Sequence, residues 1–411
     1  MEMFYQDISK NFQITWEVLL KDISHSKEFN PYCYHSDFYE VFKQLILSIL
    51  LNEEIILLDS DLSQQELKKL TNYSEFSQFN KSINTKNLSG LSSTTDLLNK
   101  LKQVNQNWSL TLFTSGTTGL PKKVKHSFLS ITRFIKVSPN KASNIWGFAY
   151  SPTHMAGVQV FFQALLNQNL IVRLFGLPKE MVFQSIEKFR ITNISATPTF
   201  YRLLLPAKKS YSNVTHITSG GEKFDEKTIN QLKMIFINAK ITNIYASTET
   251  GTLFAANGDI FSIKPELIHF VRFEHNELLI HKSMMGVSEI NSEEWYHTGD
   301  VVEVISENPL QFHFVSRSKE MINVGGYKVN PIEVEDTIRN IEGIHDVRVF
   351  SKKNSVLGNI ICCEIIRTNE QLDESTIRIY LQSRLQEFKI PRLVRFVNNI
   401  PTTRSGKTKR N

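Results

Sequence analysis

Hydrophobic and polar positions divide the first part of the chain into a helix, a strand and a polar stretch. From Phe38 onward, apolar residues recur at helical spacing and then condense into residues 55–58, which predicts a helix followed by a buried strand. Residues 63–100 are polar and rich in Ser, Asn, Lys and Thr, so we expect loops with short helices there. A short strand is predicted at residues 110–113, and it runs directly into the sequence TSGTTGLPKKV.

Short apolar runs alternate with helical stretches through the middle of the chain. The runs lie at residues 146–150, 170–174, 194–196, 216–218 and 241–245. This alternation predicts an α/β architecture with a largely parallel sheet, whose ligand-binding loops follow the strand ends.

The pattern changes after residue 261. Shorter extended runs, for example residues 277–280 and 311–315, are separated by turns, which predicts a more β-rich subdomain.

The last part of the chain has the pattern of a small, separate α+β unit. A Gly-Gly turn is followed by predicted helices at residues 331–340 and 375–386 and predicted strands at residues 346–350 and 360–365. We place the boundary near Arg317 to Lys319. The sequence thus predicts an N-terminal domain of residues 1–317 and a C-terminal domain of residues 318–411, in keeping with the usual length of roughly 100 to 200 residues per domain.

Composition and charge fit a globular protein that handles anions. Hydrophobic residues make up 41% and charged residues 21%, so apolar burial can offset chain entropy over most of the length. The formal net charge is +6, which suits anionic small molecules or an acidic partner surface. The basic residues are scattered except at the end of the chain, at Arg404, Lys407, Lys409 and Arg410. Since no finger, RNP or helix-turn-helix signature accompanies them, no nucleic-acid partner is expected.

Cysteine usage and the first residues favour a cytoplasmic protein. Cys33, Cys362 and Cys363 are an odd set with no legible disulfide framework, which is typical of a reducing compartment. The start, MEMFYQDISK, lacks the order of a signal peptide. The most apolar run, residues 45–51, is far shorter than the roughly 20 residues of a membrane-spanning helix, so no span is expected.

The sequence after the strand at residues 110–113 has the chemistry of a phosphate-binding loop. Glycines let backbone N–H groups point into one concavity, hydroxyls add donors and lysines add positive charge. The residues of this kind are Thr114, Ser115, Gly116, Thr117, Thr118, Gly119, Lys122 and Lys123. An ordinary strand-to-helix turn with incidental Ser and Thr is the alternative.

This loop is not the P-loop of kinases and GTPases, because the GxxxxGK[ST] spacing is absent. The C-terminal sequence SGKT contains Lys407, yet Pro401 stands where that motif needs Gly. We therefore reject the P-loop reading.

Seven motifs in order along the chain resemble the adenylate-forming superfamily, which comprises acyl- and aryl-CoA ligases, stand-alone adenylation domains and luciferase. The resemblance spans roughly residues 40–411. The motifs are TSGTTGLPKKV, SPTHMAG (151–157), TSGGE (218–222), YASTETG (245–251), YHTGD (296–300), SRSKEMINVGGYKVNPIEVE (316–335) and PTTRSGKTKR (401–410).

The resemblance implies a fold and a reaction. The implied fold is a large N-terminal domain of several subdomains, with parallel-sheet α/β layers and a β-rich part, and a small mobile α+β C-terminal domain. In such enzymes a substrate carboxylate attacks the α-phosphorus of ATP and pyrophosphate leaves, while preorganised cations and donors meet the developing charge. The acyl group then passes to the thiol of coenzyme A or of a carrier-protein phosphopantetheine.

The resemblance also implies roles for residues of the middle motifs. Tyr245 matches the aromatic residue that stacks on adenine, and Thr248 matches a phosphate contact. Glu249 matches a ligand of Mg²⁺, a hard cation that prefers oxygen; the alternative for Glu249 is a solvated loop charge. Asp300 resembles the carboxylate that binds the ribose hydroxyls, although a turn-forming Asp is the alternative. Arg317 resembles a second ribose contact.

Two lysines resemble parts of the moving C-terminal domain. Lys407 matches the lysine that this domain swings into the site to bridge the carboxylate and the α-phosphate, a contact that suits a flexible ammonium. The alternative is a solvated lysine of a basic tail. Lys319 matches the hinge about which the small domain rotates.

Further positions complete the implied site. His154 resembles the wall between the acyl pocket and the thiol tunnel, with a structural histidine as the alternative. Gly325 and Gly326 resemble the turn that lines that tunnel, with a plain hairpin turn as the alternative. The implied cofactor-binding residues of TSGGE are Gly220, Gly221 and Glu222.

Some positions depart from the family pattern. The phosphate loop comes early, so part of the usual N-terminal subdomain is expected to be missing or compressed. Lys123, Ala246 and Ser316 stand where the family usually has glycine. These changes leave the charged groups intact, so they bear on loop geometry more than on the reaction class.

The motifs restrict the substrate acid only partly and are compatible with two thiol acceptors. Relatives that activate amino acids usually carry an Asp near SPTHMAG, and none occurs in residues 151–160. We therefore expect an aryl or aliphatic acid without an α-amine. Net charge does not choose between coenzyme A and an acyl carrier protein. The competing hypotheses are a non-catalytic nucleotide-binding scaffold and, with no supporting feature, an oxygenase.

Overall fold

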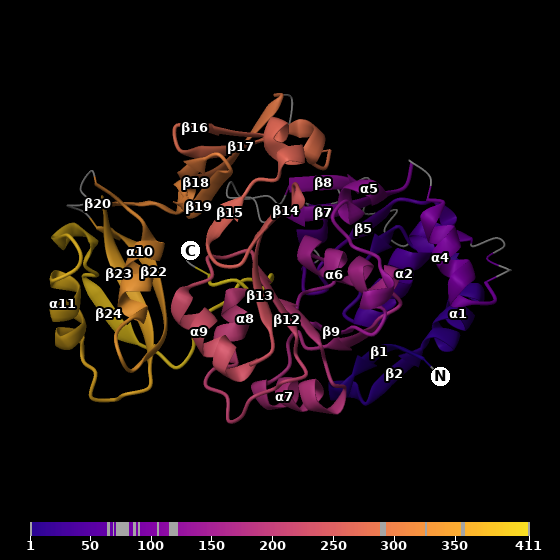
Figure 1. Ribbon diagram of the computed structural model, residues 1–411, viewed down its shortest axis with the longest axis horizontal. Helices are drawn as coiled ribbons and strands as arrows, with labels where there is room; N and C mark the ends of the chain where they lie inside the picture. Colours follow the sequence, from indigo (N-terminus) through magenta and orange to yellow (C-terminus); the bar gives the residue numbers. More distant parts are fainter. Residues whose placement is uncertain are drawn as a thin grey trace.

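A computed structural model describes the following residues of the chain: 2–63, 66–68, 70, 82–84, 88, 91–104, 107–114, 122–287, 293–324, 327–354 and 358–409. Within them the chain forms a large body of α/β layers and a smaller α+β unit (Figure 1). The smaller unit, coloured orange to yellow, lies to one side of the body, and the yellow end of the chain runs back into the body.

The largest sheet of the body has eight strands in the order β14-β13-β12-β11-β9-β10-β1-β2. The central strands from β13 to β1 run parallel, and an antiparallel strand closes each edge. The bounds, in sheet order, are β14 (Gly251–Ala256), β13 (Lys240–Ser247), β12 (His216–Gly220), β11 (Asn193–Ala196), β9 (Ile145–Phe148), β10 (Leu170–Arg173), β1 (Met3–Asp7) and β2 (Phe12–Thr15).

Helices connect the parallel strands and bury their apolar side chains. Ile194 on β11 and Ile217 on β12 are almost fully buried, as expected for a sheet that is covered on both faces. The connecting helices are α6 (Met155–Leu166), α7 (Lys179–Lys188), α8 (Pro198–Leu203) and α9 (Glu226–Ile235). The α/β architecture with a largely parallel sheet is therefore confirmed.

A second, four-stranded sheet of order β4-β5-β7-β8 lies beside the first, with more helices around it (Figure 1). Its strands are β4 (Tyr32–Cys33), β5 (Ile55–Leu57), β7 (Ser109–Thr114) and β8 (Lys122–Ser127). The helices of this part are α1 (Trp16–Ser24), α2 (Phe38–Leu51), α4 (Thr94–Lys102) and α5 (Phe128–Thr132). A short pair, β3 (Glu28–Phe29) and β6 (Ile83–Asn84), lies in the same region.

Local sequence fixes α2, the longest of these helices, and tertiary packing anchors it. Asp37 accepts a hydrogen bond from Tyr39 N at the start, and Asn52 ends the helix in the left-handed conformation, which Asn tolerates better than most residues. The ring of Phe42 stacks on that of Phe161 in α6, with the ring centroids 4.6 Å apart. One apolar core therefore joins the two sheets.

The predicted β-rich subdomain is a five-stranded antiparallel sheet of order β15-β19-β18-β17-β16. Its strands are β15 (Ile260–Ser262), β16 (Val271–Glu274), β17 (Glu277–His281), β18 (Trp295–Glu307) and β19 (Leu310–Arg317). Phe312 is fully buried at its centre.

The C-terminal unit packs two helices on a three-stranded sheet of order β22-β23-β24. Its elements are β20 (Ile322–Val324), β21 (Tyr327–Val329), α10 (Pro331–Arg339), β22 (Ile344–Asn354), β23 (Gly358–Arg367), α11 (Glu374–Gln382) and β24 (Leu393–Phe396). The predicted helices and strands of this unit all occur, with small differences at their ends.

The first strands, β1 and β2, were not predicted. β1 pairs in parallel with β10 and in antiparallel with β2, and Arg173 of β10 forms an ion pair with the buried Asp7 at 2.9 Å. Neither strand is long enough to show a clear hydrophobic period, and the strand that joins them to the sheet, β10, lies far away in the sequence.

Among the helices that are described, none combines the length and apolar character that crossing a bilayer requires. Cys33, Cys362 and Cys363 are buried and free.

Candidate active site

One cavity of about 1010 Å³ lies where loops at the carboxyl ends of the parallel strands meet the smaller sheets and the end of the chain. Carboxyl ends of neighbouring parallel strands share one edge of a sheet, which is where open α/β folds place their ligands. The loops after β9, β11, β12 and β13 all contribute to the cavity wall, and so do residues of the C-terminal tail, which we define as residues 401–409.

The structure brings most of the predicted residues to this cavity. Those that line it are Lys122, His154, Gly220, Gly221, Thr248, Glu249, Arg317 and Lys407. Glu222, Tyr245 and Asp300 are not among the lining residues. Asp300 binds Arg317 of the wall and the Tyr245 hydroxyl, whereas Glu222 binds Thr199 and Thr408. Lys319 lies in the single turn Ser318–Glu320, next to Arg317.

Some predictions cannot be placed. Thr114 ends β7, but the heart of the phosphate loop, Ser115, Gly116, Thr117, Thr118 and Gly119, lies outside the described residues. Gly325 and Gly326 also lie outside them. The roles proposed for these residues stay predictions.

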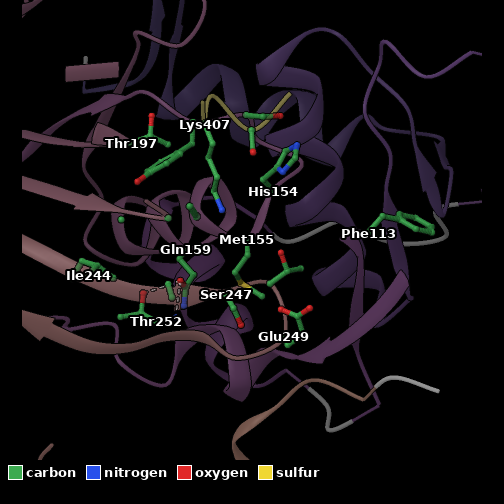
Figure 2. A pocket seen from close by; sticks show the side chains of 18 of the residues that line it. Phe113, His154, Met155, Gln159, Thr197, Ile244, Ser247, Glu249, Thr252 and Lys407 are labelled. Atoms are coloured by element: carbon green, nitrogen blue, oxygen red, sulfur yellow. Dashed lines mark hydrogen bonds between the residues drawn. The ribbon is translucent and has the colours of Figure 1, made fainter. Parts of the chain in front are cut away.

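Lys407 reaches into the cavity from a tight turn of the tail (Figure 2). Thr403 shapes that turn: its backbone N donates to Lys407 O at 2.7 Å, and its hydroxyl accepts from Lys407 N at 3.1 Å. Burial lowers the pKa of Lys407, and the nearby Arg317 lowers it further. The lysine is thus held among the polar groups of the cavity rather than in bulk water.

The body holds the tail through several polar contacts. The Thr197 hydroxyl donates to Gly406 O at 2.8 Å, and Thr408 N donates to Glu222 Oε1 at 2.6 Å. Arg404 pairs with Asp61 at 2.8 Å. These contacts join residues that are far apart in the sequence.

A glycine makes room for the lysine. Gly221 has a φ of +87°, and a Cβ there would lie 2.8 Å from Lys407 Cε. A side chain at this position would be strained and would push against the lysine. Gly221 therefore permits the close passage of Lys407 past the end of β12.

Asp300 is buried beside the cavity, and its two partners are the partly buried Tyr245 and the half-exposed Arg317. Arg317 Nε donates to Asp300 Oδ1 at 2.9 Å, and the Tyr245 hydroxyl donates to Asp300 Oδ2. Burial raises the pKa of Tyr245 well above its usual value, and the Asp300 charge raises it further, so this hydroxyl remains a donor at neutral pH. Each carboxylate oxygen has two acceptor positions, so Asp300 keeps capacity to accept further hydrogen bonds.

The segment of Thr248 and Glu249 rests on a histidine of β8. His126 Nε2 lies 2.8 Å from Thr248 O, and Gly286 N donates to Glu249 O at 2.7 Å. Burial lowers the pKa of His126 to about 4, so the ring is neutral at pH 7 and its Nε2–H can donate to the carbonyl. The Glu249 carboxylate is left facing the cavity (Figure 2).

His154 directly precedes α6 and lies beside a carboxylate from the loop after β5. Its Nε2 lies 3.2 Å from Asp59 Oδ1, and the Thr153 hydroxyl donates to the same oxygen. Burial alone would raise the pKa of Asp59, but the contacts with His154 and Thr153 lower it below its usual value. The cavity wall therefore carries a fixed negative charge here.

The first turns of α6 present an amide to the cavity. Gln159 Oε1 accepts from Thr252 N at 3.2 Å and from the Thr252 hydroxyl at 3.0 Å (Figure 2). Phe134, Trp146 and Val160 line the same cavity. A fixed amide beside apolar and aromatic walls can hold an organic skeleton with few polar groups.

Sequence reasoning missed several residues of this wall, and it missed His126, which supports the wall from behind. Asp59 and Thr197 each follow a predicted strand directly, so a search of strand ends could have found them. His126 and Gln159 carried no such signal, because their positions depend on which loops the fold brings to them.

Taken by class, the molecule is an α/β protein in which a C-terminal unit inserts a lysine into a cavity at the strand ends of a parallel sheet. The chain belongs to the AMP-binding enzyme family. The family model named AMP-binding enzyme matches residues 47–268, and the model of the AMP-binding enzyme C-terminal domain matches residues 333–407.

Curated relatives are ligases of organic acids. The mitochondrial acyl-coenzyme A synthetase ACSM1 of Mus musculus is 25% identical in an alignment 346 residues long that covers 72% of this chain and 60% of that protein. The 2-succinylbenzoate–CoA ligase of Listeria innocua is 25% identical in an alignment 342 residues long that covers 73% of this chain and 68% of that protein. The chain spans 60% and 61% of the length of ACSM1 and of a Metallosphaera sedula 4-hydroxybutyrate–CoA ligase.

Solved structures share the fold. ATP-bound MatB from Rhodopseudomonas palustris aligns with a TM-score of 0.73 at 14% identity, over 99% of this chain and 94% of that chain. An o-succinylbenzoate coenzyme A synthetase from Bacillus subtilis in complex with ATP and magnesium aligns with a TM-score of 0.71 at 16% identity, over 99% and 95% of the two chains.

Proposed function

We propose that this protein activates a carboxylic acid with ATP to an acyl-adenylate, releases pyrophosphate, and then transfers the acyl group to a thiol. The observation that carries the proposal is the position of Lys407, which the tail inserts into the same cavity that Glu249 and Thr248 line. Cations and donors fixed in place before the reaction are what an in-line attack on a phosphorus needs.

The residues around the cavity would have separate roles in the reaction. The Lys407 ammonium would meet the charge that builds up between the attacking carboxylate and the α-phosphate. Asp300 and Arg317 would bind the ribose, and Thr248, Lys122 and the residues of the phosphate loop would bind the phosphates. Tyr245 holds Asp300 in place through its hydroxyl, which adds a positioning role to the adenine contact that the family pattern implies.

Glu249 is the residue that would hold Mg²⁺. Its carboxylate faces the cavity (Figure 2), and its backbone is fixed by Gly286. Mg²⁺ usually takes one or two protein carboxylates together with substrate phosphates and water, so a single glutamate fits that ion. When bound, it would neutralise charge on the phosphates of ATP.

The relatives support the reaction class and the acceptor. Those named above are acyl-CoA synthetases or CoA ligases, and both aligned structures contain ATP. We therefore favour coenzyme A as the thiol, with the phosphopantetheine of an acyl carrier protein as the other acceptor. His154 would form the wall toward that thiol, and Lys319 would serve as the hinge for the rotation of the C-terminal unit.

We propose an aryl or aliphatic acid without an α-amine as the substrate. Met155, Ala156 and Gln159 at the start of α6 carry no carboxylate for an ammonium group, and the nearby Asp59 carboxylate is already engaged by Thr153 and His154. We also place the reaction in the cytoplasm, because three free thiols suit a reducing compartment.

Pyrophosphate release across a library of organic acids, with and without coenzyme A, tests the proposal. We expect release that depends on a particular class of acid, and a CoA thioester when coenzyme A is present. Magnesium-free reactions should show little release. If no acid stimulates pyrophosphate release although ATP binds, the protein is a nucleotide-binding scaffold and the proposal fails.

A further inference from the structure

We propose that Glu222 is the positioning residue that seats the C-terminal tail and thereby places Lys407 in the cavity. This inference rests on the proposed function, in which Lys407 serves the adenylation step. The family pattern groups Glu222 with the cofactor-binding glycines of TSGGE, but its contacts in the structure point toward the tail.

Both oxygens of Glu222 are occupied by protein donors. Oε1 accepts from Thr408 N at 2.6 Å. Oε2 accepts from the Thr199 hydroxyl at 2.6 Å and from Thr199 N at 3.2 Å. The side chain is only 9% exposed, so these contacts are shielded from water and worth more than surface ones.

The contact with Thr408 acts on Lys407 through one peptide bond. Lys407 and Thr408 share that bond, so fixing Thr408 N fixes the direction in which the lysine side chain leaves the backbone. The Thr199 hydroxyl also lies 3.1 Å from the Thr408 hydroxyl. Glu222 and Thr199 therefore both contact Thr408, the residue next to Lys407.

A buried arginine stands behind the glutamate. Arg202 lies 3.9 Å from Glu222 Oε2 and 3.3 Å from Asp225 Oδ2. Its Nε is also 3.3 Å from Asp346 Oδ1, a residue of the C-terminal unit. Burial would lower the pKa of Arg202, but Asp346, Glu222 and Asp225 raise it, so the arginine stays charged. The buried Arg202 therefore lies close both to Glu222, which binds the tail, and to Asp346 of the C-terminal unit.

A carboxylate is needed at this position because both of its oxygens accept. A carboxamide has only one acceptor, so Glu222→Gln would turn an NH₂ group toward either Thr408 N or the Thr199 donors. The change keeps the size of the side chain and removes one contact. It is therefore the sharpest variant for the test.

Two measurements test the proposal on the whole 411-residue chain. Hydrogen exchange of the tail amides, followed by mass spectrometry, should be faster in Glu222→Gln than in wild type. Acid-dependent ATP–pyrophosphate exchange should fall on the order of 10- to 100-fold in kcat, with the KM for ATP nearly unchanged, because a small misplacement of a reacting group costs about that much. Glu226→Gln, the same change at an exposed position in the same segment, should match wild type in both.

A double-mutant cycle separates an effect of Glu222 on the position of Lys407 from a general loss of structure. In a Lys407→Ala background, adding Glu222→Gln should lower pyrophosphate exchange by no more than about twofold, because the glutamate acts through the lysine. If Glu222→Gln has a lower melting temperature than wild type, Thr199→Val is the second variant. It leaves Glu222 in place, removes one donor, and should shift both readouts in the same direction.

The outcomes are distinct. Unchanged tail exchange in Glu222→Gln, unchanged pyrophosphate exchange, or full additivity with Lys407→Ala each overturns the proposal. If wild type shows no acid-dependent pyrophosphate exchange, the proposed function fails, and the claim that Glu222 seats the tail is still decided by hydrogen exchange.

Discussion

Asp59 Oδ1 lies 3.2 Å from His154 Nε2, although Asp59 follows β5 of the four-stranded sheet and His154 lies between β9 of the eight-stranded sheet and α6. The Thr153 hydroxyl donates to the same oxygen, and all three residues line the cavity. The motif around His154 contains no aspartate of its own. The cavity nevertheless carries a carboxylate, supplied by the loop after β5.

Replacing Asp59 by Asn should remove a pH-dependent part of the stability. The pKa of Asp59 is lowered in the folded protein, so its contribution is fully present above the unfolded pKa, near 4, and is lost as the pH falls through the folded pKa. Urea unfolding at neutral pH should show Asp59→Asn to be less stable by about 1 to 2 kcal/mol. The difference should shrink towards pH 3. Asp61→Asn, a nearby exposed site, should cost less than about 1 kcal/mol, and a gap that stays constant with pH would contradict the account.

Lys407→Ala should abolish adenylation and spare the second half-reaction. Loss of one preorganised cation typically lowers a rate by about 100- to 1,000-fold, and thioester formation from supplied acyl-adenylate should stay near the wild-type rate because the lysine is then no longer at the reacting atoms. Lys409→Ala, at the exposed neighbouring position, is the matched control. An equal loss in both half-reactions would refute the rotation of the C-terminal unit.

Gly221→Ala should also impair adenylation, because an added Cβ at 2.8 Å would displace Lys407 Cε. Gly258→Ala is the control, since Gly258 has a φ of +148° but no atom within 4 Å of its ideal Cβ. Both variants carry backbone strain on the order of 1 to 2 kcal/mol. Only Gly221→Ala should lose pyrophosphate exchange; a similar loss in Gly258→Ala would show that strain alone is responsible.

Tyr245→Phe should destabilise the protein by about 1 to 2 kcal/mol, because it removes a hydroxyl that donates to the charged, buried Asp300. The ring stays, so its packing against Phe254 and Phe312 is kept. Thermal unfolding measures the loss, with Tyr327→Phe on the surface as the control. Equal melting temperatures for Tyr245→Phe and wild type would show that Asp300 does not need this donor.

Asp346→Asn should loosen the contact between the body and the C-terminal unit. It removes the carboxylate that this unit supplies to Arg202 and Arg339, and breaking a buried pair costs about 3 to 5 kcal/mol when the remaining charge has no other partner. Arg202 keeps Asp225, so we expect about 1 to 3 kcal/mol. Faster hydrogen exchange in α9 and α10 is the measurement, and Glu370→Gln, an exposed site, should leave it unchanged.

The spacing of apolar residues along the chain predicted helices and strands well where it was regular over a whole element. The helix α2 and the strands from β9 to β13 correspond to apolar runs that were visible in the sequence. The strands β1 and β2 were missed because both are short and because they join the sheet through the pairing of β1 with β10, which lies far along the chain. Such pairing leaves little trace in a segment of a few residues.

For the site, the sequence by itself determined the chemistry that the chain can offer, because residues such as Lys407, Glu249 and Asp300 sit in motifs whose local spacing carries the information. Only the tertiary structure decided which groups meet. It brought Asp59 to His154, His126 beneath Thr248, and Glu222 to the tail instead of to the cavity. The physical reason is that hydrogen bonds and ion pairs between distant segments depend on the packing of whole layers, and no short stretch of sequence contains both partners.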